Sequence, residues 1–351
     1  MTSLLEIQEL RKLYPVPGDV PQWLERIRAW SSHRQHHTPN LHAVDGVNLE
    51  VAAGESVGLV GESGCGKSTL VGLINRLIEP SSGKILFNGE DIASVPVRRF
   101  PRDSRRGDIQ VVFQDPHDSL NPRFSAFDCI AEPLRRIGKT RSSELKPSVE
   151  ALANSVGLPL ELLQRLPHQL SGGQKARINI ARALATNPRL LILDEPTSAL
   201  DVSVQAVVLQ LLDSLRRERG ISYLFVSHDL NVVRLLCDRV VVMYLGQVIE
   251  QGPADTVFSK PQHPYTQALI SAIPKPTVYD QTPRIRLNGE LNSPIDPSAH
   301  ACRFYGRCPR GEVRCGEEAP RQRHVGYGHW AACHFADPDL QTAIKRGTRG
   351  T

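Results

Sequence analysis

Short apolar stretches separated by polar turns predict alternating strands and helices along most of the chain. The expected strands are residues 4–10, 43–51, 56–60, 190–193, 222–226 and 239–245. A helix is expected to begin near Lys67. Another follows residue 202, with apolar positions at i, i+3 and i+4 spacing: Val204, Val207, Val208, Leu211, Leu212 and Leu215. Strands that alternate with helices imply a largely parallel sheet, so the expected fold class is α/β.

Three segments depart from this pattern. Residues 18–40 contain several prolines and a stripe of Trp23, Ile27 and Trp30, and they are interpreted as an insertion. That stripe is expected to pack on its own domain, with contact to lipid or to a membrane protein as the alternative. From about 120 to 170 helical patterns replace β-branched runs, which predicts a helical subdomain. Beyond Pro253 the chain becomes rich in Pro, Arg and Cys, so we expect domains at 1–255 and 256–351.

The bulk properties exclude some classes of function. The 351 residues carry 42 basic and 37 acidic side chains, a net charge of +5 without a dominant basic block, which is typical of a solvated surface and not of a nucleic-acid partner. No stretch approaches the roughly 18 apolar residues that span a bilayer, so a membrane role requires a partner. The first residues do not resemble a signal peptide, and a cytosolic protein without disulfides is expected.

A glycine-rich segment follows the expected strand at 56–60. It reads Gly61-Glu62-Ser63-Gly64-Cys65-Gly66-Lys67-Ser68 and fits the phosphate-binding loop pattern, with Thr69 next in the chain. The glycines let backbone N–H groups face phosphates, the following helix adds its dipole, and Lys67 adds a positive charge. Ser68 would ligate Mg²⁺. A plain glycine turn would not explain Lys67 and Ser68 together.

Two carboxylates end the expected strand at 190–193. Asp194 is placed to hold Mg²⁺ through water, and Glu195 is placed to activate a water nucleophile. Paired acids at a strand end are common by themselves. The functional interpretation therefore depends on the phosphate-binding loop.

A second glycine pair stands ahead of another expected helix. The segment reads Leu170-Ser171-Gly172-Gly173-Gln174. Two glycines at a helix start predict a second anion site, with Ser171 free to donate to a phosphate.

These segments together resemble the ATPase subunits of ABC transporters over about residues 4–255. The features that carry the resemblance are the phosphate-binding loop, LSGGQ at 170–174, the strand end at Asp194 and Glu195, Ser198-Ala199-Leu200-Asp201, and His228. The resemblance implies a RecA-like parallel-sheet core, an antiparallel β subdomain, a helical subdomain and a small cysteine-rich appendage. It also implies ATP and Mg²⁺ as ligands.

Roles for single residues follow from the resemblance. It implies that Tyr14 stacks on adenine, that Gln114 senses the γ-phosphate and Mg²⁺, and that Glu195 is the catalytic base. His228 would hold the γ-phosphate and the attacking water, and Asp201 would lie at a dimer interface. Strand packing of Tyr14 and strand capping by Gln114 and His228 are the structural alternatives. In this family two cassettes pair head to tail, so the chain would pair with a copy of itself or a sister subunit.

Two further motifs resemble the F-type subunits of oligopeptide and dipeptide importers. They are Val112-Phe113-Gln114-Asp115-Pro116 with Ser119-Leu120-Asn121-Pro122-Arg123, and Pro261-Gln262-His263-Pro264-Tyr265-Thr266. The resemblance implies two membrane permeases, a sister ATPase and an extracytoplasmic binding protein, with this chain on the cytoplasmic side of the membrane. The alternatives are a nickel importer, a soluble ABC ATPase acting on nucleic acid, and a redox sensor.

Four cysteines crowd the last fifty residues with the spacing C-x5-C-x6-C-x17-C: Cys302, Cys308, Cys315 and Cys333. In a cytosolic protein they indicate an iron–sulfur cluster, zinc or unligated thiols. Zinc ribbons usually show paired C-x2-C knuckles, which are missing. Similar tails in peptide-importer ATPases are associated with a 4Fe-4S cluster, and the resemblance favours that group in a structural role.

Overall fold

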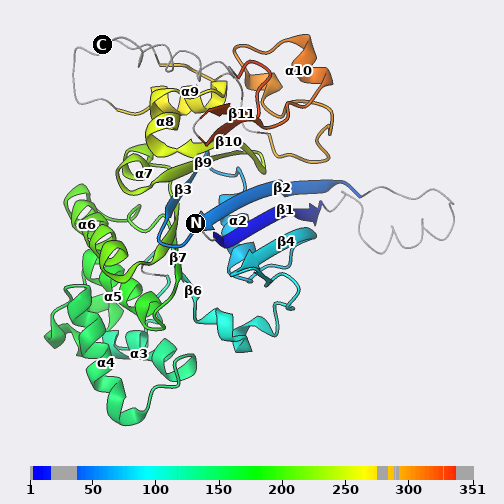
Figure 1. Ribbon diagram of the computed structural model, residues 1–351. Coiled ribbons are helices and arrows are strands. Elements are labelled where there is room, and N and C mark those ends of the chain that lie inside the picture. The colour runs from blue at the N-terminus through cyan, green and yellow to red at the C-terminus, as the bar shows by residue number, and fades with distance from the viewer. Residues whose placement is uncertain are drawn as a thin grey trace, which may run out of the picture.

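The computed structural model describes residues 3–16, 38–116, 118–274, 284–287, 289, 292–326 and 328–336 (Figure 1). The expected insertion at 18–40 falls almost entirely outside the described residues, so the stripe of Trp23, Ile27 and Trp30 is not placed. No described helix combines the length and apolar character that crossing a bilayer needs.

An eight-stranded mixed sheet forms the centre of the molecule, in the order β11-β12-β10-β9-β3-β8-β7-β6. The strands from β9 to β6 are parallel, and β10, β12 and β11 continue the sheet antiparallel. The bounds of the parallel strands are β3 Ser56–Val60, β6 Ile109–Val112, β7 Leu190–Asp194, β8 Ser222–Val226 and β9 Arg239–Tyr244. The strands expected at 56–60, 190–193, 222–226 and 239–245 are therefore confirmed.

Alternate residues of each parallel strand enter two separate cores. In β7, Leu191 and Leu193 pack with the helices of one face, and Leu190 and Ile192 pack with the other. Side chains alternate along a strand, so a strand covered on both faces must be apolar throughout. This explains why these strands read as unbroken apolar runs.

A second, four-stranded antiparallel sheet covers one face of the first, in the order β2-β1-β4-β5. Helix α2 (Lys67–Ile74) contacts both sheets, and its Leu70 and Leu73 belong to their shared core. The strands are β1 Ser3–Pro15, β2 Asn40–Ala52, β4 Ser82–Phe87 and β5 Glu90–Asp91. Strands β1 and β2 are longer than the sequence predicted.

Helices fill the region between β6 and β7, where the helical subdomain was expected. Helix α3 (Ala126–Arg136) contacts α4 (Ser142–Ser155) and α5 (Gly172–Leu184). The Ser125 side chain accepts a hydrogen bond from the Asp128 amide and so caps α3. Helices α6 (Val202–Arg219) and α7 (Leu230–Leu236) follow, and Val207 of the predicted α6 stripe is exposed.

The C-terminal part continues the main sheet. Its elements are β10 Gln247–Pro253, α8 Ala254–Ser259, α9 Pro264–Ser271, α10 Val313–Glu317, β11 Arg323–Gly326 and β12 His329–Ala331. The expected boundary between 255 and 256 lies inside α8. Strand β12 pairs with β10, and Phe304 packs against Tyr244 and Tyr265 in the main core. This part of the appendage therefore packs into the main core, while Val325, Ala331, Cys333 and Ala336 form a small cluster of their own.

We expect His263 to make folding sensitive to acid. Burial lowers the pKa of His263 to about 4, although the charge of Glu250 opposes this shift. An unfolded histidine titrates near 6.5, so its contribution to stability is complete above that pH and is lost as the pH falls toward 4. The free energy of unfolding should drop by about 2 kcal/mol between pH 7 and pH 5 from this residue alone.

Urea unfolding of the wild type and of His263→Asn at both pH values measures that drop. Asparagine keeps an acceptor for the Tyr265 amide, which donates to Nδ1 of His263, and removes the titration together with the ring contact to Phe304. The lost ring contact lowers stability at both pH values, so the difference between the two pH values reports the titration. The exposed His300→Asn variant serves as the control. Equal pH dependence in wild type and His263→Asn would contradict the assignment.

Candidate active site

The glycine-rich loop connects β3 to α2 and lies against neighbouring backbone. A Cβ atom on Gly66 would stand 2.2 Å from the Ala43 carbonyl oxygen, and one on Gly61 would stand 2.3 Å from that of Met243. Their φ angles of 107° and 153° add to the restriction. In the described chain no side chain caps the amino end of α2. The helix start is therefore free to face an anion.

Lys67 is buried beneath this loop. Its Nζ donates to the Gly61 carbonyl oxygen at 2.7 Å and to that of Glu62 at 3.0 Å. Only 7% of the residue is exposed. The ammonium group is thus held at the inner side of the loop, where a phosphate would meet a poorly solvated positive charge.

Three predicted catalytic side chains meet at the end of β7. Gln114 Nε2 donates to Glu195 Oε2 at 2.9 Å, and His228 Nδ1 lies 3.1 Å from Glu195 Oε1. Glu195 has a φ of 47°, a conformation that costs energy in a residue other than glycine. The carboxylate is therefore fixed by contacts from two other strand ends.

The neighbouring Asp194 lies deeper. Burial raises its pKa, the charge of Glu195 raises it further, and Lys67 opposes both effects. A cation near this carboxylate would favour its ionised form and so oppose the shift, which is compatible with the predicted role in holding Mg²⁺.

One cavity of about 570 Å³ brings most of the predicted residues together. Its size is within the range of small-molecule sites. The predicted residues on its wall are Tyr14, Ser63, Gly64, Gly66, Lys67, Ser68, Thr69, Gln114, Asp194, Glu195 and His228. Three other loop residues, Gly61, Glu62 and Cys65, do not line it. Cys65 is buried, and burial raises the pKa of its thiol.

The cavity also has walls that sequence reasoning missed: Leu41, Ala43, Gly246, Ser293 and Pro294. Pro294 is held at the site because its carbonyl oxygen accepts a hydrogen bond from the amide of His42, near the start of β2. Ser293 and Pro294 stand in a Pro-rich stretch without periodicity, so no local signal pointed to them. Gly246, with a φ of 81°, was detectable only as a turn.

The LSGGQ segment lies away from this cavity. Ser171 caps α5, accepting from the Gln174 amide while Gln174 Oε1 accepts from the Ser171 amide. Cβ atoms on Gly172 and Gly173 would stand 3.2 Å and 2.6 Å from Leu200 and Val204. Close packing on the start of α6 thus explains both glycines within one chain. The anion role of Ser171 stays a prediction.

Asp201, the predicted interface residue, caps α6 and does not line the cavity. Its side chain accepts from the Val204 amide at 2.9 Å and from the Ser203 hydroxyl at 2.8 Å. The hydrogen bond from Val204, followed by that from Ser203, lowers the pKa of Asp201. The residue stays ionised at the surface, as an interface contact would require.

The four C-terminal cysteines, Cys302, Cys308, Cys315 and Cys333, lie near one another. The Cys302 amide donates to the Cys315 carbonyl oxygen at 2.8 Å. Burial raises the pKa of Cys302 to about 11, with repulsion from Cys315, Cys308 and Cys333 adding to it. Among the described residues no group of three or more His, Cys, Asp or Glu side chains is arranged to hold a metal ion. The predicted 4Fe-4S cluster, or zinc, is not supported by this geometry.

Comparisons with known proteins decide the family. Residues 44–198 match the family model described as ABC transporter, and residues 249–315 match that described as Oligopeptide/dipeptide transporter, C-terminal region. The probable peptide ABC transporter ATP-binding protein y4tS of Sinorhizobium fredii is 43% identical over 96% of this chain and 91% of its own length. The chain belongs to the oligopeptide/dipeptide ABC transporter ATP-binding proteins. The oligopeptide transport ATP-binding protein AppF of Bacillus subtilis is 42% identical to this ATP-binding subunit, over 95% of the subunit and 97% of AppF.

Solved ATP-binding cassettes share the fold of the subunit. The cbiO1 protein of Clostridium perfringens, part of the ABC transporter complex cbiONQ, superposes with a TM-score of 0.59 at 31% identity, covering 74% of the subunit and 92% of cbiO1. The cassette MJ0796, a dimer in a post-hydrolysis state with ADP and Pi, gives 0.60 at 28% identity, covering 71% and 98%. The subunit is therefore an ABC ATPase, for which ATP and Mg²⁺ are the expected ligands.

Replacing Lys67 by alanine should weaken ATP binding. The change removes the buried ammonium from the phosphate side of the loop, and charge-assisted hydrogen bonds are worth about 1.5–3 kcal/mol, or roughly 10- to 150-fold in Kd. Calorimetric titration with Mg-ATP measures the change, and Lys84→Ala, on the exposed part of β4, is the matched control. Equal ATP affinity in Lys67→Ala and wild type would rule out this site.

Proposed function

We propose that the subunit hydrolyses ATP in this cavity to drive the import of oligopeptides or dipeptides through separate membrane permeases. The observation that carries the proposal is Glu195, held by Gln114 and His228 at the wall of the cavity that contains the phosphate-binding loop. The peptide class is supported by the names of the relatives and by the match of the C-terminal region.

The residues of the site share the tasks of the proposed mechanism. The loop amides, the amino end of α2 and Lys67 bind the phosphates, and Tyr14 at the end of β1 stacks on the adenine. Ser68, Gln114 and Asp194 would hold Mg²⁺, which neutralises phosphate charge when bound. Glu195 accepts a proton from water, while Gln114 and His228 keep its carboxylate in place.

A second cassette is required in this mechanism. Neither Ser171 nor Asp201 lines the cavity of the same chain, so the LSGGQ segment is available to complete the site of a facing subunit. The dimeric MJ0796 cassette supports this arrangement. The partner is a sister ATPase or a second copy, and Asp201 lies at their interface.

A larger groove is the proposed contact with a permease. It has a volume of about 1160 Å³ and extends from Ser68, Gln114 and Asp194 to Glu132 and Arg136 of α3. Phe113, 40% exposed, lies on its wall. A permease segment seated there would touch Gln114, so docking and catalysis would be coupled. We accordingly place the subunit at the cytoplasmic side of the membrane, with two permeases, an extracytoplasmic binding protein and no nucleic acid.

The 4Fe-4S cluster on Cys302, Cys308, Cys315 and Cys333 stays a prediction from the sequence. Its support is the spacing of the cysteines and their proximity. Among the described residues no group of side chains is arranged to hold a metal ion. We therefore route no step of the mechanism through it.

Glu195→Gln should abolish turnover and keep ATP bound. The amide cannot accept the proton of the attacking water, and loss of a general base costs about 10²- to 10⁴-fold in rate. Phosphate release with the partner subunits present, together with dimer formation by light scattering, measures both effects. The control is Glu218→Gln, on the exposed face of α6. Turnover near that of the wild type would remove Glu195 from the mechanism.

Metal analysis decides the cysteine prediction. If these cysteines hold the cluster, anaerobic purification should yield iron and acid-labile sulfide with a visible absorption band. All three should be reduced in Cys308→Ser and retained in Cys129→Ser, whose buried thiol belongs to α3. A colourless protein with one zinc would overturn the cluster. A protein without metal would leave the four cysteines as unligated thiols.

A further inference from the structure

Glu62 of the phosphate-binding loop is fixed at three points. Its amide donates to the Tyr265 hydroxyl oxygen at 2.7 Å, and its carbonyl oxygen accepts from Lys67 Nζ at 3.0 Å. Its carboxylate accepts from Arg307 Nη1 at 2.7 Å and from Nη2 at 3.2 Å. Two of the three partners come from the C-terminal part of the chain. The same residue thus contacts the phosphate-binding lysine and a distant arginine.

Arg307 is held in place by its surroundings. It ends a short 3-10 helix, Tyr305–Arg307, that follows the buried Phe304. Its guanidinium lies 5.9 Å from the centre of the Tyr244 ring, and Nη1 is 3.5 Å from the Tyr244 hydroxyl. The side chain is only 13% exposed. A two-pronged guanidinium to carboxylate contact of this kind fixes orientation as well as distance.

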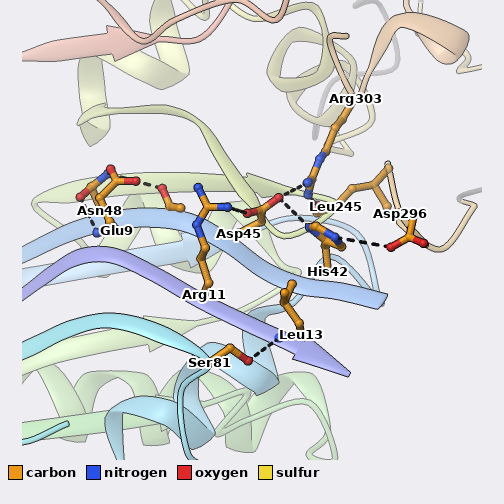
Figure 2. Close-up of polar contacts among 11 residues, drawn as sticks. Glu9, Arg11, Leu13, His42, Asp45, Asn48, Ser81, Leu245, Asp296 and Arg303 are labelled. Carbon is orange, nitrogen blue, oxygen red and sulfur yellow. Dashed lines mark hydrogen bonds and ion pairs between the residues drawn. The ribbon is translucent and has the colours of Figure 1, made fainter. Parts of the chain in front are cut away.

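A second arginine of the same segment supports the loop from another side. Arg303 donates to Asp45 and to the Leu245 carbonyl oxygen, and Figure 2 shows it reaching both from the C-terminal part. Burial alone would raise the pKa of Asp45, but the His42 hydrogen bond and the charges of Arg303 and Arg11 hold it below its usual range. Asp45 is therefore an ionised anchor.

Asp45 is connected to the phosphate-binding loop through the backbone of Gly246. The Asp45 amide donates to the Gly246 carbonyl oxygen at 2.9 Å, and the Gly246 amide donates to that of Cys65 at 2.8 Å. Gly246 itself lines the nucleotide cavity. Arg307 therefore contacts the loop at Glu62, and Arg303 is linked to it at Cys65 through Asp45 and Gly246.

We propose that Arg307 is a positioning residue for nucleotide binding. Arg307 holds the Glu62 carboxylate. Because the Glu62 carbonyl oxygen accepts a hydrogen bond from Lys67 Nζ, this contact also determines the position of the Lys67 ammonium group. This inference rests on the proposed nucleotide site. It assigns to the C-terminal region a task that the hydrolysis mechanism does not require of it.

Mg-ATP affinity and steady-state hydrolysis of the full chain test this proposal. The contact is partly exposed, so we expect Arg307→Ala to raise Kd and KM roughly three- to tenfold and to change kcat less than about twofold. Arg307→Lys keeps the charge without the paired hydrogen bonds and should lie between. Arg310→Ala, an exposed arginine in the same loop, is the matched control.

A double-mutant cycle separates positioning from general stabilisation. Glu62→Gln should raise Kd by a factor similar to Arg307→Ala, and the double variant should add little to either. The exchange Glu62→Arg with Arg307→Glu should recover part of the affinity. Multiplicative effects, or an unchanged Kd in folded Arg307→Ala, would overturn the proposal.

Lys67→Ala, measured in the same experiment, distinguishes failure of the nucleotide site from failure of the positioning role of Arg307. If it weakens ATP binding and Arg307→Ala does not, only the positioning role fails. If Lys67→Ala leaves ATP binding unchanged, the nucleotide site fails, and the role of Arg307 fails with it.

Discussion

The close approach of backbone to the loop after β3 is the constraint on which the site depends. The carbonyl oxygens of Ala43 and Met243 leave no space for a side chain at Gly66 and Gly61. These oxygens come from β2 of the small sheet and β9 of the large one, so the loop is shaped where the two sheets meet. The direction of α2, the depth of Lys67 and the walls of the cavity all follow from that junction.

Local pattern predicted the parts of the molecule that local chemistry determines. The parallel strands are apolar on both faces because two cores cover them, and the limits of β3, β7, β8 and β9 were predicted almost to the residue. Strand β6, with only four residues, was not among the predicted strands. Gln114, Glu195 and His228 follow three such strands. Parallel strands end at one edge of the sheet, which explains why these side chains meet. The roles of Gln114 and His228 were implied by the family resemblance and not by the strand pattern.

Long-range contacts could not be predicted in this way. Arg307 and Glu62 are 245 positions apart, and nothing in either neighbourhood indicates the other. Strand β12 has three residues, too few for a periodic signal, yet it extends the main sheet. Gly172 and Gly173 fitted a phosphate-binding pattern, while their close packing on Leu200 and Val204 depends on the tertiary fold. The cysteine spacing indicated a metal without fixing the geometry that would hold it.

The buried carboxylate of Glu250 explains why the C-terminal part is attached to the ATPase core. Glu250 of β10 is fully buried, and its carboxylate accepts from the Gln262 and His263 amides. The third partner is His329 of β12. Its Nε2 lies 2.7 Å from Glu250 Oε1, and its side chain is only 1% exposed. Detaching β12 would remove one hydrogen-bond partner of this buried carboxylate, and leaving a buried polar group unsatisfied costs about 1–3 kcal/mol. The hairpin formed by β11 and β12 is therefore held to the sheet whether or not the cysteines bind a metal. Arg303 and Arg307 of the same C-terminal part contact Asp45 and Glu62, so the region that completes the sheet also contacts the nucleotide site.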